Sequence, residues 1–458
     1  MYIITKVFSM RRYFDFIKKL TLIAIPIILQ QLFLNIASLL DTLMVGQLDE
    51  ANVSGVYIAT QIIFVVNLMM FGSIEGGSVF FCQFFGKQDE RNLKKSFVFK
   101  LYASLIIGTL ATIFILIFGR SLSSLFIKDP VAIDISVSYL NILAISFIPF
   151  GVIISITSSM RESHNTILPM SITLFGVIVN FLINYIFIYG KLGMPKLGGV
   201  GAAIGTTAER LLELLILLIF CVKKKYVFCA NIFNYLNIEI KLFKEMVKKS
   251  IPLLINETLW ALGQTVLVYV FSKSAEISTV VLPIATTIFN LIFVVCLGIG
   301  NAITILVANT VGTGNFEKSQ NEAHVSLFFS AFVGIILGVI LFIVAPIITS
   351  LYTGVSSEAQ QLAEILIKFY GIYLFISALN NSIFFILRAG GRTLLVFIFD
   401  SLYGWILQIP FAFLLLYVFK LEFIPLVIVS YSIDIVKTVV GLILILSKRW
   451  YRNLTLIN

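Results

Sequence analysis

Residues 25–60 read IPIILQQLFLNIASLLDTLMVGQLDEANVSGVYIAT, and the landmarks of this stretch return 226 residues further along the chain. That offset joins Ile25-Pro26 to Ile251-Pro252, Ile58-Ala59-Thr60 to Ile284-Ala285-Thr286, Gly72 to Gly298 and Gly86 to Gly312. A further pair, Arg161…Thr166 and Arg388…Thr393, recurs at an offset of 227. Because the offset stays constant over more than sixty residues, we predict that the chain contains a duplication. Duplicated halves are typical of secondary transporters, whose site lies between the repeats.

The composition places the chain in a lipid bilayer. Hydrophobic residues make up 59% of the 458 residues, charged residues only 12%, and the mean hydropathy is +1.03, which is too apolar for an ordinary soluble domain. About 20 apolar helical residues span the hydrocarbon core, and the runs that qualify are residues 20–45, 53–83, 97–119, 131–160, 167–190, 199–222, 250–272, 278–311, 323–352, 359–388, 393–418 and 422–447. Membrane strands would alternate in polarity, which these runs do not. We expect an all-α membrane protein with twelve transmembrane helices in two pseudo-symmetric six-helix lobes.

Lys and Arg are distributed unevenly between the two ends of these helices. Of the 33 basic residues, 24 precede the first helix, follow the last one or lie in the even-numbered connections. Basic connections stay on the cytoplasmic side, so we expect a protein of the inner membrane with both termini in the cytoplasm. The charge of +10 then reports topology and not nucleic-acid binding. The expected division is a basic amphipathic lead-in (1–19), an N-lobe (20–222), a cytoplasmic linker (223–249), a C-lobe (250–447) and a cytoplasmic tail (448–458).

Few residues of the chain can do covalent or metal chemistry. The two histidines, His164 and His324, lie beside predicted inner loops, and the four cysteines lack metal-ligand spacing. No nucleotide phosphate-loop motif is present. We therefore expect neither an enzyme, nor a cofactor, nor a transition-metal site.

Sparse polar side chains within the apolar helices are the candidates for function. A buried carboxyl can exchange Na⁺ for H⁺, because burial favours its protonated form and a bound cation favours its ionised form. Glu257 and Asp400 each lie about seven residues from the inner end of their helix, at about 10 Å depth. They could share one ion-coupling cavity with Asn256 and Asn381, and Asn301 is a further cavity candidate.

Several other intramembrane residues leave two interpretations open. Asn180 and Asn184 share a helix face and either coordinate a cation or bridge to a neighbouring helix. Glu75 either faces a proton-accessible cavity or packs within the bundle. Structural ion pairs are favoured over gating roles for three sets of charged residues: Arg210 with Glu213, Lys437 with Asp434, and Lys368 with Glu364.

The order of several motifs resembles the multidrug and toxic compound extrusion (MATE) transporters. The motifs are Pro26…Asp41-x-x-x-Val45-Gly46, Gly72…Gln83-x-x-Gly86-x-x-Asp89, Asn180-x-x-x-Asn184 and Leu197-Gly-Gly-Val-Gly-Ala-Ala203, with a second-half match at Pro252 and Glu257. The resemblance covers nearly the whole chain. It implies two six-helix lobes that export mostly cationic, amphipathic compounds in exchange for Na⁺ or H⁺.

Position by position, the resemblance implies an N-lobe ion site made of Asp41, Asn180, Asn184 and Thr206. Glu257 is similar to the helix-7 acid of NorM-type members, which implies a role in C-lobe cation binding. Many members carry Asp where this chain has Asn184, and NorM-type proteins have an acid in the stretch that corresponds to residues 377–381, where none stands here. Asp400 is our candidate for its replacement.

An alternative function within the same wider superfamily is a flippase for lipid-linked precursors. A pyrophosphate lipid would require several Arg or Lys residues in the central cavity, whereas most intrahelical cations of this chain have acidic neighbours. Drug export is therefore the favoured prediction. The expected partners are small organic cations and membrane lipids, not nucleic acid, and the expected state is a monomer.

Overall fold

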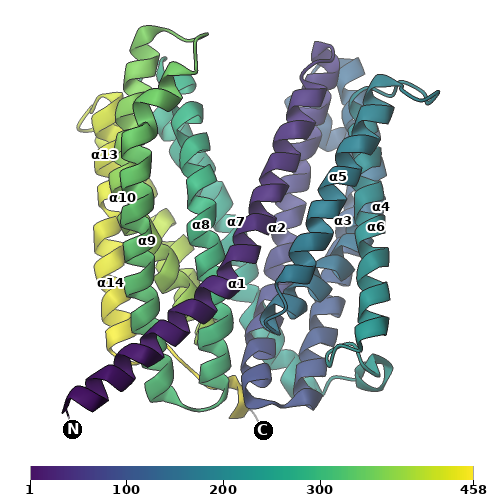
Figure 1. Cartoon of the computed structure of the whole chain (residues 1–458). Coiled ribbons are helices and arrows are strands. Elements are labelled where there is room, and N and C mark those ends of the chain that lie inside the picture. The colour runs from purple at the N-terminus through teal and green to yellow at the C-terminus, as the bar shows by residue number, and fades with distance from the viewer. Residues whose placement is uncertain (1, 457–458) are drawn as a thin grey trace. The chain divides into compact units, whose positions relative to one another are not determined.

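The computed structural model describes the backbone of residues 2–456 and the side chains of residues 13–456. The helices follow one another in the predicted order (Figure 1). The first six are α1 (Tyr2–Val45), α2 (Glu50–Lys87), α3 (Glu90–Phe126), α4 (Pro130–Glu162), α5 (Ile167–Tyr189) and α6 (Gly199–Lys224). The short η1 (Ile232–Tyr235) precedes α7 (Ile240–Ser272), α8 (Ser278–Gly312), α9 (Phe316–Ser350) and α10 (Ser357–Ala389). The remainder comprises α11 (Thr393–Phe397), η2 (Ile398–Leu402), η3 (Gly404–Gln408), α12 (Ile409–Tyr417), α13 (Phe423–Ser432), α14 (Asp434–Leu446) and η4 (Leu454–Leu456).

Local sequence signals set many helix boundaries. The Asp49 side chain accepts a 2.9 Å hydrogen bond from the backbone of Asn52 at the start of α2, and Asp89 accepts one of 3.1 Å from Asn92 at the start of α3. Such caps satisfy amide groups that lack a partner in the first turn. Gly190 ends α5 with φ +67°, a left-handed conformation that glycine adopts without strain.

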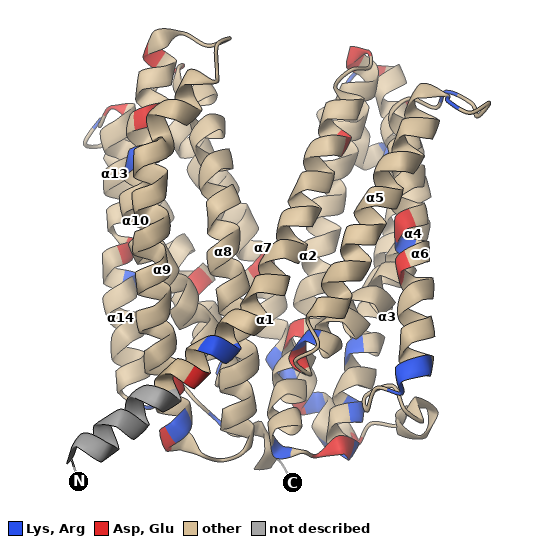
Figure 2. Cartoon of the chain, viewed as in Figure 1, with Lys and Arg blue, Asp and Glu red and all other residues tan. Residues whose placement is uncertain are grey.

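Eleven helices of the described chain are long and apolar enough to cross a membrane. Of the twelve predicted spans, α6 does not meet this criterion. Every 18-residue stretch of its 26 residues contains Glu209, Arg210 and Glu213, which Figure 2 shows as red and blue bands on α6. Elsewhere the helices expose large apolar side chains, such as Phe328 (78% exposed) and Phe332 (61%) on α9. Such surfaces suit contact with lipid.

The chain divides into two compact units. Unit 1 comprises the chain up to Ile28 together with Ile255–Leu456, and unit 2 comprises Leu29–Leu254. The two units therefore divide within α1 and α7, and not at the linker where we expected the lobe boundary. The corresponding prolines, Pro26 and Pro252, lie inside these two helices, close to the points of division.

Each unit has its own apolar core. In unit 2 the core includes Ala59, Met70, Leu140 and Phe147, all 0% exposed, on helices α2 and α4. In unit 1, α10 packs along both α9 and α14 (Figure 1). Helix backbones approach closely where α9 meets α10, because a Cβ at Gly338 would overlap the carbonyl oxygen of Gly371. Small residues at such crossings are typical of membrane helix packing.

Two of the predicted helices are interrupted in the structure. The predicted 393–418 helix contains two π-helical stretches, η2 and η3, and the predicted 422–447 helix divides at Ile433 into α13 and α14. Gly404 begins the second π-helical stretch and Pro410 follows it, whereas the break at Ile433 has no Gly or Pro beside it. The lead-in and the first span form the single helix α1; the side chains at 1–12, part of the predicted amphipathic lead-in, lie outside the described residues.

The segment after α14 packs against the helices as far as it is described. Trp450 is 0% exposed, and its indole donates a 2.7 Å hydrogen bond to Gln320 Oε1 on α9. The Arg452 amide donates to the Gly390 carbonyl (2.7 Å), and Tyr451 stacks on Phe316. Within the predicted tail at 448–458, Trp450, Leu454 and Thr455 are therefore buried, whereas Leu456 is exposed; residues 457–458 lie outside the description.

Candidate functional site

Four predicted N-lobe residues meet in unit 2. The Asn184 side-chain amide of α5 donates hydrogen bonds to Asp41 Oδ1 on α1 (2.6 Å) and to Asn180 Oδ1 (2.9 Å). Asn180 in turn donates to the Thr206 hydroxyl on α6, at 3.3 Å. Asn180 and Asn184 are buried, at 3% and 0% exposed, whereas Asp41 is partly buried. The structure thus joins a carboxylate, two carboxamides and a hydroxyl from three helices.

A glycine makes room for this group. Gly205 precedes Thr206 on α6, and a Cβ at Gly205 would overlap Asn184 Oδ1. This buried carbonyl oxygen accepts no hydrogen bond from the residues that the structure describes. Its free lone pairs, together with the Asp41 carboxylate and the Asn180 carbonyl, provide the oxygen ligands that hard cations prefer.

Sequence reasoning missed Glu209 as a neighbour of this site. Its carboxyl lies 3.3 Å from the position of a Cβ at Gly176 and within hydrogen-bonding reach of Asn180. Glu209 lies one turn beyond Thr206 on the same helix face, and this spacing of three residues was the available signal. The acidic character of the site therefore extends from α1 to α6.

In unit 1, the structure brings Asp400 and Asn256 together. Asp400 lies in η2, and its two carboxylate oxygens have different partners. Oδ1 forms a 2.8 Å ion pair with Lys437 Nζ of α14, and Oδ2 accepts a 3.2 Å hydrogen bond from Asn256 of α7. The Asp400 and Lys437 side chains are 15% and 13% exposed. Glu257 is partly buried and interacts electrostatically with Asp400.

The π-helical backbone around Asp400 is held by the same asparagine. The Ser401 amide donates to Asn256 Oδ1 at 3.2 Å, and its hydroxyl donates to the Asn256 backbone and side-chain oxygens, both at 2.8 Å. A π-helical turn inserted in an α-helix often marks a functional position. The two other predicted members of this group lie elsewhere: Asn381 donates to the Cys296 carbonyl (2.7 Å), and Asn301 donates to Leu297 within its own helix (3.0 Å).

Two of the three predicted ion pairs are wrong in their partners. Lys437 pairs with Asp400, whereas Asp434 accepts a hydrogen bond from the Tyr373 hydroxyl. Asp434 and Lys437 are only three residues apart on α14, but the neighbouring helices offer both side chains better-placed partners. The Lys368–Glu364 pair is present, with 2.6 Å between Nζ and Oε1.

Arg210 is the second correction. Its guanidinium donates to Ser146 Oγ (2.8 Å) and lies 4.1 Å from the centroid of the Phe150 ring. Its predicted partner Glu213 instead accepts a 3.2 Å hydrogen bond from the Thr173 hydroxyl. Polar and aromatic side chains of α4 thus hold this buried cation, a form of cation–π stabilisation.

Glu75 is partly buried on α2 in unit 2. The adjacent Gly76 packs so closely on α7 that a Cβ there would overlap Ser250. The two interpretations of Glu75, a residue that faces a proton-accessible cavity or one that packs within the bundle, stay predictions.

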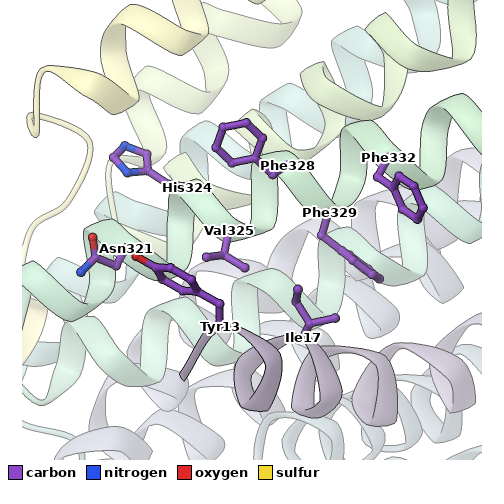
Figure 3. Close-up of a pocket in the computed structure, with 8 residues that line it drawn as sticks. All are labelled: Tyr13, Ile17, Asn321, His324, Val325, Phe328, Phe329 and Phe332. Carbon is purple, nitrogen blue, oxygen red and sulfur yellow. The ribbon is translucent and has the colours of Figure 1, made fainter. Parts of the chain in front are cut away.

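An apolar groove of about 500 Å³ lies between the beginning of α1 and α9 (Figure 3). It is lined by Tyr13, Ile17, Asn321, His324, Val325, Phe328, Phe329 and Phe332. None of the lining residues is acidic, and none belongs to the predicted ion sites. The groove is therefore a poor candidate for cation coupling.

The family model described as MatE matches residues 26–186 and again residues 252–414. The chain belongs to the MatE family. The family resemblance stated from the motifs is thereby confirmed, and the protein is a multi-pass membrane protein of a transporter family. The two matched segments begin at Pro26 and Pro252, the positions from which the internal repeat was recognised.

Curated relatives of this MatE-family protein span almost its whole length. The "Probable multidrug resistance protein NorM" of Halalkalibacterium halodurans is 26% identical over 405 residues, which cover 87% of each chain. The "Multidrug resistance protein MdtK" of Pectobacterium atrosepticum is 24% identical over 424 residues, which cover 89% of each chain.

Solved structures confirm the fold of the MatE-family chain. An outward-facing multidrug resistance MATE family transporter of the MOP superfamily superposes with a TM-score of 0.84 at 18% identity, covering 94% of this chain and 96% of the other. A MOP superfamily transporter from Pyrococcus furiosus gives a TM-score of 0.84 at 19% identity, with the same coverage.

The two halves of the MatE-family protein use equivalent positions with different chemistry. Gln30 bonds Thr173 (2.9 Å) in unit 2, and the equivalent residues of unit 1 are the hydrogen-bonded pair Asn256 and Asp400. The Asp41 site itself has no polar counterpart, because Leu267, Leu407 and Phe411 occupy the positions equivalent to Asp41, Asn180 and Asn184. The acids of the two sites, Asp41 in unit 2 and Asp400 in unit 1, therefore do not occupy equivalent positions of the repeat.

Proposed function

We propose that this protein is a secondary antiporter that exports amphipathic, mostly cationic compounds across the inner membrane in exchange for Na⁺ or H⁺. The observation that carries the proposal is the site around Asp41, where neutral carboxamide and hydroxyl groups hold a carboxylate within a transmembrane bundle. Relatives similar along 87–89% of the chain are named as multidrug resistance proteins, which supports drug-like cargo.

The chemistry of the site supports cation coupling. Asp41 is bonded by the neutral Asn184 and forms no ion pair with a Lys or Arg of the described chain. An incoming H⁺ or Na⁺ can therefore neutralise this carboxylate without displacing a built-in cation. A coupling ion drives transport only if its affinity for Asp41 differs between the two conformations of the cycle. Binding of the ion and binding of the cargo would then favour opposite conformations of the transporter.

Glu257 is our proposal for the second ion-responsive acid, in unit 1. The charge of Asp400 is balanced by Lys437 at 2.8 Å, whereas the neighbouring carboxyl of Glu257 forms no ion pair with any Lys or Arg whose side chain the structure describes. Asn256 lies beside Glu257 in the chain and binds Asp400. A cation bound at Glu257 would therefore change the electrostatic field at Asp400 and at the π-helical backbone around it.

The proposal is tested by transport of a fluorescent lipophilic cation, such as ethidium, in liposomes that contain the purified full chain. We expect an imposed Na⁺ or H⁺ gradient to drive the dye against its concentration gradient, and the Asp41→Asn variant to lose this response. The matched control is Asp134→Asn, because Asp134 is 62% exposed in a surface ion pair with Arg120. Absence of dye movement under either gradient would contradict the proposal. Translocation of a pyrophosphate-linked polyprenol instead would favour the flippase.

We also propose that both termini face the cytoplasm, and the distribution of Lys and Arg supports this orientation. Phe233 in the linker and Leu192 in the α5–α6 connection are 82% and 84% exposed. In a cysteine-free background, a membrane-impermeant maleimide should label Leu192→Cys from the cell exterior and leave Phe233→Cys unlabelled. The reverse pattern would contradict the orientation.

A further inference from the structure

Two of the four cysteines lie in contact outside the sites described above. Cys221 lies in the last turn of the long helix α6, and Cys229 lies in the segment that follows it. Their sulfur atoms are 3.3 Å apart, and both thiols are free. Cys221 is buried at 7% exposure, whereas Cys229 is partly exposed. Neither cysteine belongs to the candidate ion sites around Asp41 and Asp400.

The backbone that follows α6 folds back so that the sulfurs meet. Lys225 ends the helix in a left-handed conformation with φ +46°. The amides of Cys229 and Ala230 then both donate to the Tyr226 carbonyl, at 2.9 Å. These bonds close a compact turn and direct Cys229 toward α6.

Aromatic packing fixes this turn onto unit 2. Phe228 is 1% exposed and packs edge-on against Phe97 and Phe81, at centroid distances of 5.0 and 5.9 Å. The Tyr226 ring stacks on Phe228, and its hydroxyl accepts a 2.7 Å hydrogen bond from Asn165. The buried packing of Phe228 therefore holds the turn in the position that brings the two thiols together.

We propose that Cys221 and Cys229 form a redox-sensitive dithiol that closes reversibly to a disulfide when the protein meets a peroxide. The peroxide oxidises one thiol to a sulfenic acid and releases one water. The second sulfur then displaces the hydroxyl group as a second water, and the S–S bond forms. Two electrons pass from the two sulfurs to the peroxide in total. A thiol such as dithiothreitol reverses the step by thiol–disulfide exchange.

The setting of the pair supports a switchable bond over a permanent one. A disulfide needs a sulfur separation of about 2.05 Å, so the observed contact closes with a small side-chain movement. Disulfides in reducing compartments are usually transient and redox-sensing, and this turn lies on the side that we predict to be cytoplasmic. The bond would fasten the end of α6 to the segment that leads into α7, the helix within which the two units divide.

The sequence between the two cysteines makes the test direct. Trypsin cleaves after Lys223, Lys224 and Lys225, so it separates Cys221 from Cys229 unless they are joined. The full-length protein in liposomes is treated with hydrogen peroxide, free thiols are alkylated with N-ethylmaleimide under denaturing conditions, and the tryptic peptides are weighed. We expect a joined peptide two hydrogens lighter than the sum of its parts, which dithiothreitol separates.

Serine variants show which residues are required. Cys221→Ser and Cys229→Ser should each abolish the joined peptide, whereas the matched controls Cys82→Ser and Cys296→Ser should leave it unchanged. The two control cysteines are buried at 1% and 3% exposure and lie within α2 and α8. Alkylation of both Cys221 and Cys229 after peroxide would overturn the proposal, and so would irreversible oxidation of either thiol without joining.

Discussion

Asn184 donates a 2.6 Å hydrogen bond to Asp41, although the two residues are 143 positions apart in the chain. The contact joins α5 to α1 within unit 2 and orients both side chains around one small polar site. A hydrogen bond to a charged group contributes about 1.5–3 kcal/mol. Loss of this hydrogen bond should therefore lower the affinity of the site for its coupling ion by about one to two orders of magnitude.

Gly205→Ala should impair this contact without touching Asp41 directly. The new methyl group would overlap Asn184 Oδ1, so the Asn184 side chain must turn away from the carboxylate. We expect ion-driven dye efflux to fall by about tenfold, the effect of losing about 1.4 kcal/mol. The matched control is Gly354→Ala, where no atom lies within 4 Å of the added carbon. Equal efflux by the two variants would show that the position of Asn184 does not matter.

Lys437→Met should destabilise the fold by leaving the Asp400 charge inside unit 1 without its ion-pair partner. Breaking a fully buried pair costs about 3–5 kcal/mol, and the cost is lower here because the two side chains are 13% and 15% exposed. Thermal unfolding in detergent micelles measures it. The double variant Asp400→Asn/Lys437→Met should recover most of the loss. A single variant as stable as the wild type would contradict the importance of the pair.

Glu257→Gln should abolish ion-coupled efflux while the protein remains folded and inserted in the membrane. The amide preserves the size of the side chain but cannot exchange H⁺ or bind a cation by charge. Gradient-driven dye transport measures the loss, and Glu358→Gln, on an exposed position at the start of α10, is the control. Unchanged transport by the Glu257 variant would remove this residue from the mechanism.

Trp450→Ala should destabilise the protein strongly, although residue 450 follows the last transmembrane helix. A buried aromatic side chain replaced by alanine costs about 3–5 kcal/mol, and the hydrogen bond to Gln320 is lost as well. Thermal unfolding checks this value. Phe233→Ala, at a position 82% exposed, should leave the unfolding temperature nearly unchanged. If both variants unfold at the wild-type temperature, the packing of the tail is not stabilising.

The architecture could be predicted because its signals are local. Long apolar runs mark the helices, and the shared landmarks beginning at Pro26 and Pro252 mark the duplication. The N-lobe group could be named only from the order of family motifs. Spacing alone places Asn180 and Asn184 on one face, but it does not say that α1 brings Asp41 to them.

The features that were missed depend on contacts between distant segments. Arg210 was assigned to Glu213 because they share a helix, yet Ser146 and Phe150 on α4 are its partners. The π-helical turn at Asp400 accompanies a hydrogen bond from Ser401 to Asn256, 145 positions away. The burial of Trp450 depends likewise on Gln320 of α9. No local pattern encodes such pairings.

The central claim is that cargo and a coupling ion exchange at the Asp41 site. The most direct measurement is the release of H⁺ or Na⁺ when ethidium is added to the purified, ion-loaded protein in weakly buffered detergent solution. We predict that the wild type and Asp134→Asn release the ion as the dye binds, and that Asp41→Asn releases less. Equal release by wild type and Asp41→Asn would contradict the assignment of coupling to Asp41.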